Sequence, residues 1–299
     1  MSVVPTVRLA YPERLRSEVE AFLQTVRFSE ALQTAGLEEA MRYSLLGGGK
    51  RIRPVLALAT AEALGGEPEP ILPLAAALEL IHTYSLIHDD LPAMDDDDLR
   101  RGRLTCHRAF GEDVAILAGD ALYAEAFRLL LTRQSGAPAR VLAAAARLAT
   151  ATGVGGMVGG QYIDVTGGAE PGANGLRRLH ALKTGQLIAA SVECVFELLP
   201  AVAGVDGASL RAFAAELGVL FQIVDDILDV TGTQEALGKQ QGADARLGKR
   251  TYVTEFGLDG ARRLAAESHQ RARDALQRAV PAGAGELGAI TDFIATRSY

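Results

Sequence analysis

Two aspartate-rich runs, each flanked by apolar residues, place the strongest constraint on how this chain can fold. The first run occupies residues 88–98 and reads HDDLPAMDDDD, and the second occupies residues 221–229 and reads FQIVDDILD. The apolar flanks place both runs on mostly buried helices, where an unpaired carboxylate is costly. The fold must therefore bring cations to both runs.

Helix geometry lets each run gather its carboxylates on one side. Asp225 and Asp229 lie about 40° apart on a regular helix, so both can reach the same ion. Asp89 and Asp95 would lie about 120° apart on a straight helix. Pro92, however, should end or kink that helix, so that Asp95 can turn back. Because dense like charges repel unless a cation neutralises them, and Mg²⁺ prefers carboxylate oxygens, the paired runs predict several magnesium ions.

The acidic runs also have a simpler interpretation. Runs of like charge are usually solvated helix faces or helix caps, and for residues 95–98 taken alone this interpretation is as good as a metal site. The occurrence of two such runs, both within apolar helices, favours the metal site for the pair.

The rest of the chain has the pattern of an all-α protein. Ala and Leu dominate, and apolar positions recur at spacings of three and four residues. No fixed-period repeat or long linker is present, which favours one domain over residues 1–299, built as a single bundle of long helices. The pattern predicts helices over 13–29, 36–46, 53–64, 70–91, 113–134, 138–153, 156–165, 174–198, 207–230, 259–280 and 286–296.

Composition and charge exclude several classes of protein. The net charge of -7 over 299 residues argues against nonspecific nucleic-acid binding. No uninterrupted apolar run reaches the roughly 18 residues of a membrane span, and the N-terminus lacks a secretory pattern, so we expect a cytoplasmic protein without a membrane span. Cys106 and Cys194 lie far apart without metal-ligand spacing, which predicts ordinary thiols.

A basic, glycine-rich segment at 47–54, GGGKRIRP, opens one of the predicted helices. Its backbone N–H groups, the helix dipole and its cations predict an anion site. The segment is not a Walker P-loop, because Lys50 is followed by Arg51 rather than by Ser or Thr. Arg100 and Arg101 follow the first acidic run, and metal carboxylates beside guanidinium groups predict two anionic substrates. A solvated side chain is the better interpretation for Arg51, Arg103 and Arg250.

With these motifs in order, the chain resembles the trans-type isoprenyl diphosphate synthases, and most closely the bacterial farnesyl diphosphate synthases. The resemblance spans nearly the whole chain. It is carried by GGKRIRP at 48–54, the run 81–103, GGQ at 159–161, KTG at 183–185, FQ with its DDxxD at 221–229, and LGK at 237–239. It implies an all-α bundle of long helices around a central cavity, and a homodimer.

The resemblance also implies a role for individual residues. Magnesium, three ions per site, would be held by Asp89, Asp90, Asp95, Asp225, Asp226 and Asp229. The allylic diphosphate would be held by Arg100, Lys183 and Lys239, and isopentenyl diphosphate by Lys50, Arg53, His82 and Arg101. Lys183, Thr184 and Gln222 would be catalytic, with Thr184 and Gln222 beside the reacting carbon. Lys249 would belong to a closing loop at 238–249. Without the resemblance, His82 would be interpreted as a core residue.

The implied reaction joins isopentenyl diphosphate to dimethylallyl or geranyl diphosphate after magnesium-assisted ionisation, with farnesyl diphosphate (C15) as the product. Tyr84 and Ser85 lie one helical turn before Asp89, and the ring of Tyr84 is the candidate floor that limits chain length. The chain departs from its relatives at Leu104, where Pro is common, and at a less basic C-terminus with Arg297 as its candidate contact to isopentenyl diphosphate.

Several alternatives remain beside this interpretation. A geranylgeranyl diphosphate (C20) synthase would share every motif, and a non-catalytic partner subunit of the same fold would be expected to lack one acidic run. A terpene cyclase binds one diphosphate and would not need the basic set at 50–53 with Arg101. A di-iron bundle needs two Glu-x-x-His pairs, whereas only Glu79 to His82 qualifies here.

Overall fold

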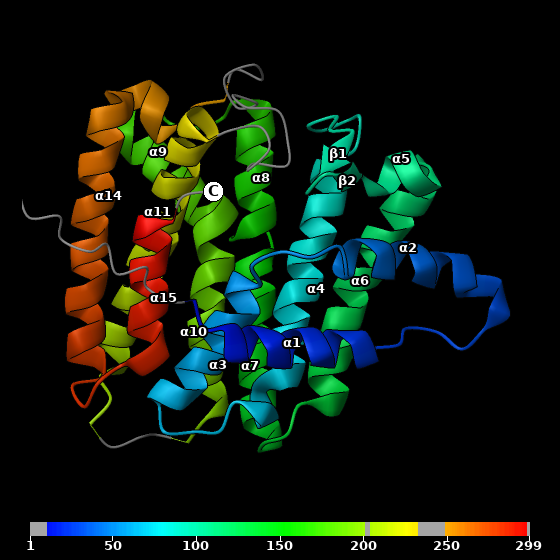
Figure 1. Ribbon diagram of the computed structural model, residues 1–299, viewed down its shortest axis with the longest axis horizontal. Coiled ribbons are helices and arrows are strands. Elements are labelled where there is room, and N and C mark those ends of the chain that lie inside the picture. Colours follow the sequence, from blue (N-terminus) through cyan, green and yellow to red (C-terminus); the bar gives the residue numbers. More distant parts are fainter. Residues whose placement is uncertain (1–10, 201–203, 233–248, 298–299) are drawn as a thin grey trace, which may run out of the picture.

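A computed structural model describes residues 11–200, 204–232 and 249–297, and these form a bundle of long helices with one short hairpin (Figure 1). The longer helices are α1 (Glu13–Thr25), α2 (Ala35–Leu45), α3 (Ile52–Ala63), α4 (Leu72–Asp89), α6 (Glu112–Arg133), α7 (Pro138–Thr152), α8 (Met157–Thr166), α10 (Gln186–Leu198), α11 (Gly207–Thr231), α14 (Tyr252–Ala279) and α15 (Gly285–Thr296). The shorter elements are the helices α5 (Cys106–Phe110) and α9 (Gly172–His180), a π-helical turn (Ala181–Gly185), two 3-10 turns (Leu32–Thr34 and Glu69–Ile71), and the paired strands β1 (Leu99–Arg100) and β2 (Arg103–Leu104).

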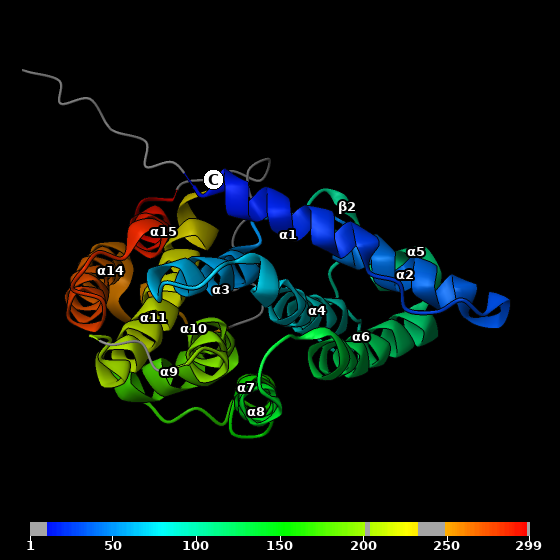
Figure 2. The same cartoon turned by 90° about the horizontal axis from the view of Figure 1, so that it is seen from below.

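The long helices are arranged side by side, and α1 and α2 cross them. Figure 1 shows α4, α6, α8, α10 and α14 running along one direction, whereas α1 and α2 lie across it. Figure 2, turned by 90°, shows α4, α10 and α11 inside a row that ends in α6 on one side and α14 and α15 on the other. The all-α bundle predicted from the sequence is therefore confirmed.

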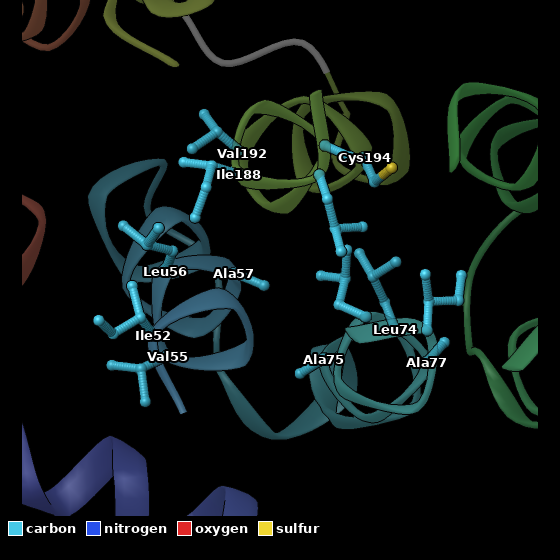
Figure 3. Close-up of a cluster of buried hydrophobic side chains, with 14 of the residues drawn as sticks. Ile52, Val55, Leu56, Ala57, Leu74, Ala75, Ala77, Ile188, Val192 and Cys194 are labelled. Carbon is cyan, nitrogen blue, oxygen red and sulfur yellow. The ribbon is translucent and has the colours of Figure 1, made fainter. Parts of the chain in front are cut away.

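The core sits where α3, α4 and α10 meet (Figure 3). Every residue of α3 from Ile52 to Ala61 is buried, which is the pattern of a helix that is covered on all sides. Leu56 of α3, Leu74 of α4 and Ile188 of α10 are each fully buried in this cluster. Because apolar side chains lock these helices together, the polar ends of α4 and α11 are held in fixed positions.

The predicted helices are largely confirmed, with differences that have local causes. α4 ends at Asp89, before Pro92, as the missing proline donor requires. The predicted helix 174–198 contains the π-helical turn, which its apolar pattern does not reveal. α14 begins at Tyr252 rather than at 259, because a helical turn precedes the kink at Gly257 (φ 69°) and is continuous with the rest of the helix. The sequence did not predict α5 or the hairpin.

The expectation that Arg51 is solvated is wrong. Its side chain is fully buried at the start of α3 and forms an ion pair with Glu79 of α4, 2.7 Å between Nη1 and Oε1. The physical reason is that Glu79 faces the packed interior of the bundle, where its carboxylate needs a cation. Glu20 of α1 completes the cluster.

Two described stretches, Glu69–Asp89 and Pro138–Thr166, are long and apolar enough to cross a membrane by length and composition. Within the first stretch, 67% of the apolar segment is buried inside the bundle. A core helix that is covered by its neighbours can have the same length and composition as a membrane span. The expectation that no segment spans a membrane stays a prediction. Cys106 and Cys194 are both buried free thiols.

The contact between α8 and the π-helical turn depends on Gly160. A Cβ atom at Gly160 would lie 2.3 Å from the backbone nitrogen of Lys183 and 2.6 Å from its Cα, and backbone cannot move aside cheaply. We therefore expect Gly160→Ala to lower the free energy of unfolding by about 1–3 kcal/mol. Chemical denaturation would measure this loss.

The matched control is Gly36→Ala on α2, where a Cβ meets nothing within 4 Å. Because alanine is favoured over glycine in a helix, this variant should be neutral or slightly more stable than the parent protein. Equal stabilities of the two variants would contradict the close contact at Gly160.

Candidate active site

Both acidic runs open into one cavity of about 1290 Å³ at the carboxyl ends of α4 and α11. Its wall includes Asp89 and Asp95 on one side, and Asp225 and Asp229 of α11 on the other. The structure thus brings together two carboxylate rows that lie more than 120 residues apart in the sequence.

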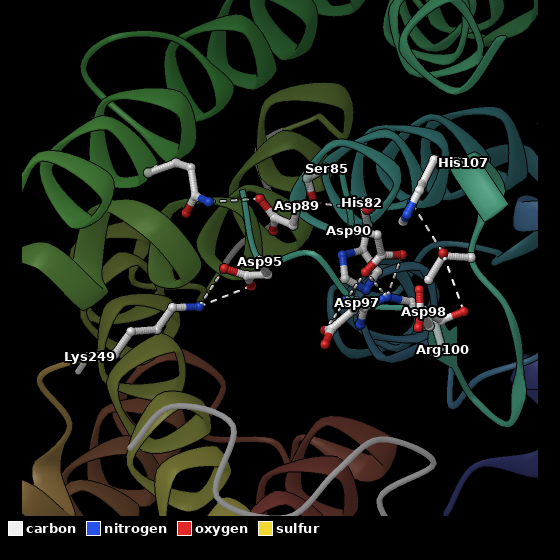
Figure 4. Close-up of polar contacts among 12 residues, drawn as sticks. His82, Ser85, Asp89, Asp90, Asp95, Asp97, Asp98, Arg100, His107 and Lys249 are labelled. Carbon is white, nitrogen blue, oxygen red and sulfur yellow. Dashed lines mark hydrogen bonds and ion pairs between the residues drawn. The ribbon is translucent and has the colours of Figure 1, made fainter. Parts of the chain in front are cut away.

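The first row has the turn that Pro92 predicts. The backbone N–H of Asp95 donates to the carbonyl of Asp89 at 2.9 Å, so the chain folds back after α4. Figure 4 shows Asp89 and Asp95 facing the same space, with Lys249 reaching Asp95 from across it. Lys249 Nζ lies 2.8 and 3.0 Å from the two oxygens of Asp95. Burial raises the pKa of Asp89 to about 6, although Lys183 opposes the shift.

Asp90 faces a different partner. Its carboxylate accepts two bonds from Arg100 Nε, at 2.8 and 2.9 Å, and a third from Nη2 at 2.5 Å. The chain turns back between α4 and β1, where the Asp97 N–H donates to the Asp90 carbonyl, and this brings Arg100 of β1 beside Asp90 (Figure 4). Asp90 is 3% exposed and is not part of the cavity wall, so its predicted metal role requires this pair to separate, whereas Arg100 lines the cavity while it holds Asp90.

The carboxylates of the second row differ in their hydrogen-bond partners and in their exposure to the cavity. Asp225 accepts a bond from Arg297 Nη2 at 3.3 Å and keeps 43% of its side chain exposed. Asp226 is 1% exposed and accepts from Gln222 Nε2 and from the backbone N–H of Tyr252, both at 2.7 Å. Asp225 is therefore much more accessible to a ligand in the cavity than Asp226 or Asp229, which is 5% exposed, although all three line it.

The π-helical turn presents the predicted catalytic residues. Thr184 Oγ1 donates to Gln222 Oε1 at 2.7 Å, so Gln222 bridges Thr184 and Asp226. Lys183 Nζ forms an ion pair with Asp164 of α8 at 2.5 Å. Such π-helical turns occur frequently at functional sites because they reorient side chains within a helix.

Sequence reasoning missed two polar side chains of this wall, Gln161 and Asp164. Gln161 Nε2 donates to Asp89 Oδ1 at 2.8 Å, and Asp164 holds Lys183. The signal that could have found Gln161 is the GGQ motif at 159–161, and Asp164 follows three residues later on the same face of α8.

Basic side chains gather beside Asp225 on the cavity wall, and we call this part of the wall the basic end. Lys50, Arg53, His82, Arg101 and Arg297 all line it. Burial lowers the pKa of Arg53 to about 10, although Glu79 opposes the shift. Burial, followed by the charges of Arg53 and Arg101, also lowers the pKa of His82. This concentration of desolvated positive charge is suited to an anion, because an anion would relieve the repulsion among the cations.

Arg297 near the C-terminus lies in this basic wall. Its guanidinium is almost fully buried and stacks over the Phe221 ring at 4.2 Å. It also donates to the Phe221 carbonyl at 3.3 Å. The Arg297 side chain therefore lies at the basic end of the cavity, a position that the sequence alone did not establish.

Part of the cavity wall near the first acidic row is apolar, and we call this part, which includes Tyr84, Leu86 and Ile116, the apolar arm. Tyr84 lines it, one turn before Asp89, and packs edge to face against Tyr123 of α6 and His88, with ring centroids 5.1 and 5.3 Å apart. Ser85 also lines the cavity, but its hydroxyl donates to the His82 carbonyl at 2.9 Å. Burial raises the pKa of Tyr84 to about 12, so this hydroxyl stays neutral.

The donor set fits magnesium that shares its ligands with a phosphate group. Within residues 11–200, 204–232 and 249–297, no three His, Cys, Asp or Glu side chains lie close enough to hold a metal ion by themselves. Mg²⁺ is typically held by one or two carboxylates together with substrate phosphates and water. Lys239 and nearly all of the predicted closing loop at 238–249 lie outside the described residues.

Comparisons with known proteins agree with this geometry. The sequence model of the polyprenyl synthetase family matches residues 34–282. A chloroplastic geranylgeranyl pyrophosphate synthase of Capsicum annuum is 47% identical over 264 residues, which cover 87% of this chain and 71% of that protein.

Solved structures give a similar result. A geranyltransferase from Legionella pneumophila is 36% identical with a TM-score of 0.81, covering 96% of this chain and 95% of its own. A geranyltransferase from Helicobacter pylori, solved as a complex with magnesium and isoprenyl diphosphate, is 32% identical with a TM-score of 0.83, covering 97% and 98%.

Proposed function

This chain belongs to the polyprenyl synthetase family and is a prenyltransferase, and from this premise we propose that it condenses isopentenyl diphosphate with an allylic diphosphate, head to tail and in trans. The observation that carries the proposal is that one cavity is lined both by the two carboxylate rows and by the Lys and Arg side chains of the basic end. Two diphosphates need these two environments, because one is held through metal ions and the other by direct bonds to Lys and Arg.

The allylic diphosphate would be held between the two acidic rows. Asp89 and Asp95 on one side, and Asp225 and Asp229 on the other, would hold magnesium, three ions per site by the family resemblance. Bound magnesium neutralises the diphosphate and stabilises it as a leaving group, so that the allylic carbon becomes electrophilic. In the metal-free protein Lys249 and Arg297 supply positive charge to Asp95 and Asp225.

The chain's own residues would orient the second substrate. Lys50, Arg53, His82 and Arg101 would bind the diphosphate of isopentenyl diphosphate at the basic end. The Thr184 hydroxyl and the Gln222 amide, joined at 2.7 Å, would lie beside the reacting carbon and stabilise developing positive charge with their oxygen atoms. Holding both substrates in one cavity converts the encounter of two molecules into a reaction within one complex.

We propose farnesyl diphosphate as the main product. The support is Tyr84, whose ring lines the apolar arm close to the acidic row and is backed by Tyr123. A second candidate is geranylgeranyl diphosphate, favoured by the curated relatives, several of which are geranylgeranyl pyrophosphate synthases at 44–47% identity.

We also propose a homodimer, in line with the family resemblance. Exposed apolar side chains on α6 support it, since Ile116, Leu117 and Leu131 are 44%, 56% and 50% exposed. The cytoplasmic location stays a prediction from the sequence.

The metal-binding role of the two rows can be tested by removing one carboxylate from each row and comparing the result with the removal of a carboxylate that does not line the cavity. We expect Asp89→Ala and Asp225→Ala each to reduce turnover by about 100-fold or more, because each removes a group that stabilises the leaving diphosphate. Incubation with isopentenyl diphosphate, geranyl diphosphate and Mg²⁺, followed by chromatography of the dephosphorylated alcohols, measures the effect. Asp98→Ala is the matched control, since Asp98 belongs to the same acidic run but pairs with Arg108 and is 66% exposed. Full turnover in the Asp89 or Asp225 variant would refute the assignment.

The raised pKa of Asp89 predicts a pH dependence of metal binding. In the metal-free protein the buried carboxyl keeps its proton until about pH 6, so stability falls as the pH rises from 3.8 through 6. A metal ion must displace that proton below pH 6. We therefore expect the thermal stabilisation given by Mg²⁺ with inorganic pyrophosphate to weaken as the pH falls through 6.

Pyrophosphate also changes its protonation over this pH range. The test therefore compares the pH dependence of the parent protein with that of a variant under the same conditions. Asp89→Asn has no proton to lose, and its response to Mg²⁺ with pyrophosphate should change less between pH 5 and 7 than the response of the parent protein. Identical pH profiles for the two proteins would show that Asp89 does not control metal binding.

The floor of the apolar arm should set product length. We expect Tyr84→Ala to shift the main product from C15 to C20 or longer, because removal of the ring opens the arm toward Tyr123. Chromatography of the alcohols reports the product. Tyr43→Ala, whose ring packs against Phe110 of α5, is the control that should leave product length unchanged. An unchanged product from Tyr84→Ala would remove Tyr84 as the floor.

A further inference from the structure

Arg51 differs from the other cations of the basic segment because its guanidinium forms ion pairs inside the protein. It lies between Lys50 and Arg53, yet its side chain has no exposed surface. Its Nη1 donates to Glu79 at 2.7 Å, its Nε donates to Glu20 at 2.8 Å, and its Nη2 donates to the carbonyl of Leu45 at 2.8 Å. One guanidinium therefore ties together α1, the end of α2 and α4.

These bonds fix the backbone of the anion-binding segment. Arg51 adopts φ 52° and ψ 40°, the left-handed region that residues other than glycine occupy at a cost. The bond from Nη2 to the Leu45 carbonyl links the two ends of the loop between α2 and α3. The Tyr11 hydroxyl donates to the Lys50 carbonyl at 2.6 Å, which holds the loop from a second side. The side chain of Arg51 thus maintains the strained turn that places Lys50 and Arg53 around it.

The same cluster balances charge beneath the basic end of the cavity. Glu20 and Glu79 carry two negative charges against the one positive charge of Arg51, so the cluster has a net negative charge. Burial by itself would lower the pKa of Arg51, but Glu79 and Glu20 together raise it. Glu79 also opposes the lowering of the pKa of Arg53 and Arg101. The cations that face the cavity therefore stay charged although they are crowded.

A purely structural ion pair would not account for these features. Buried ion pairs contribute little net stability compared with apolar side chains of similar size, so stability alone does not explain Arg51 and Glu79. The bonds converge on a strained residue next to two substrate-binding candidates, which indicates a positioning role.

We propose that Arg51, held by Glu20 and Glu79, is a positioning residue that sets the geometry of Lys50 and Arg53 for the diphosphate of isopentenyl diphosphate. This inference rests on the proposed function, because it assigns that diphosphate to the basic end of the cavity. The allylic diphosphate lies at the acidic rows and is not affected directly.

The proposal is tested with two variants. Arg51→Lys keeps the positive charge but cannot bond to Glu20, Glu79 and the Leu45 carbonyl at once, since an ammonium group lacks the planar geometry of a guanidinium. The double variant Arg51→Met with Glu79→Met removes the pair without leaving a buried charge, so it should fold even where the single change is damaging. In both, we expect the KM and the calorimetric Kd for isopentenyl diphosphate to rise by about tenfold or more, while the KM for geranyl diphosphate changes less than about twofold.

Arg14→Gln is the matched control. It breaks another ion pair between α1 and α3, to Glu62, but at an exposed position at the other end of α3. It should leave both KM values unchanged, and thermal unfolding should show all the variants folded at the assay temperature.

An unchanged KM and Kd for isopentenyl diphosphate in the folded variants would overturn the proposal, as would an equal rise in both KM values. Absence of condensation by the parent protein would instead refute the proposed function. The calorimetric Kd for isopentenyl diphosphate would then still decide whether Arg51 positions a binding site for it.

Discussion

The structure depends on the neutralisation of carboxylates at the partly buried ends of two helices. Asp89 and Asp95 on one side, and Asp225 on the other, would repel one another across a low-dielectric cavity if each were left alone. Cations of the chain pair with these carboxylates, as Lys249 does with Asp95 and Arg297 with Asp225. In the proposed function, metal ions and a diphosphate would replace these side-chain contacts at the cavity wall.

The helical core holds the two acidic rows at a fixed distance from each other. α4 ends at the first acidic row and α11 carries the second, and the largely apolar helices α3 and α10 belong to the same buried core, so the core fixes the spacing of the rows. The tight packing of Gly160 against Lys183 sets the π-helical turn beside the rows. Asp89, Gln222 and Asp225 thus sit on packed helices, whereas Lys50, Asp95 and Lys249 lie on the connecting segments beside them.

Much of the fold and part of the site could be predicted from sequence because the signals are local. Helical periodicity gave nearly every long helix, and Pro92 gave the end of α4. The spacing of Asp225 and Asp229 placed both toward the same cavity. By contrast, the hairpin that begins at Leu99, and the pairing of its Arg100 with Asp90, were not predicted, because two-residue strands carry no periodic pattern.

By itself, the sequence determined an all-α chain with two acidic rows, a basic segment and the motif order of one enzyme family. Only the tertiary structure decided which charges meet: Arg51 turns inward to Glu79, Asp226 binds Gln222, and Arg297 joins the basic wall. The reason is that helix formation depends on neighbours three and four residues away, whereas the partner of a buried charge is chosen by packing between helices that are distant in the chain.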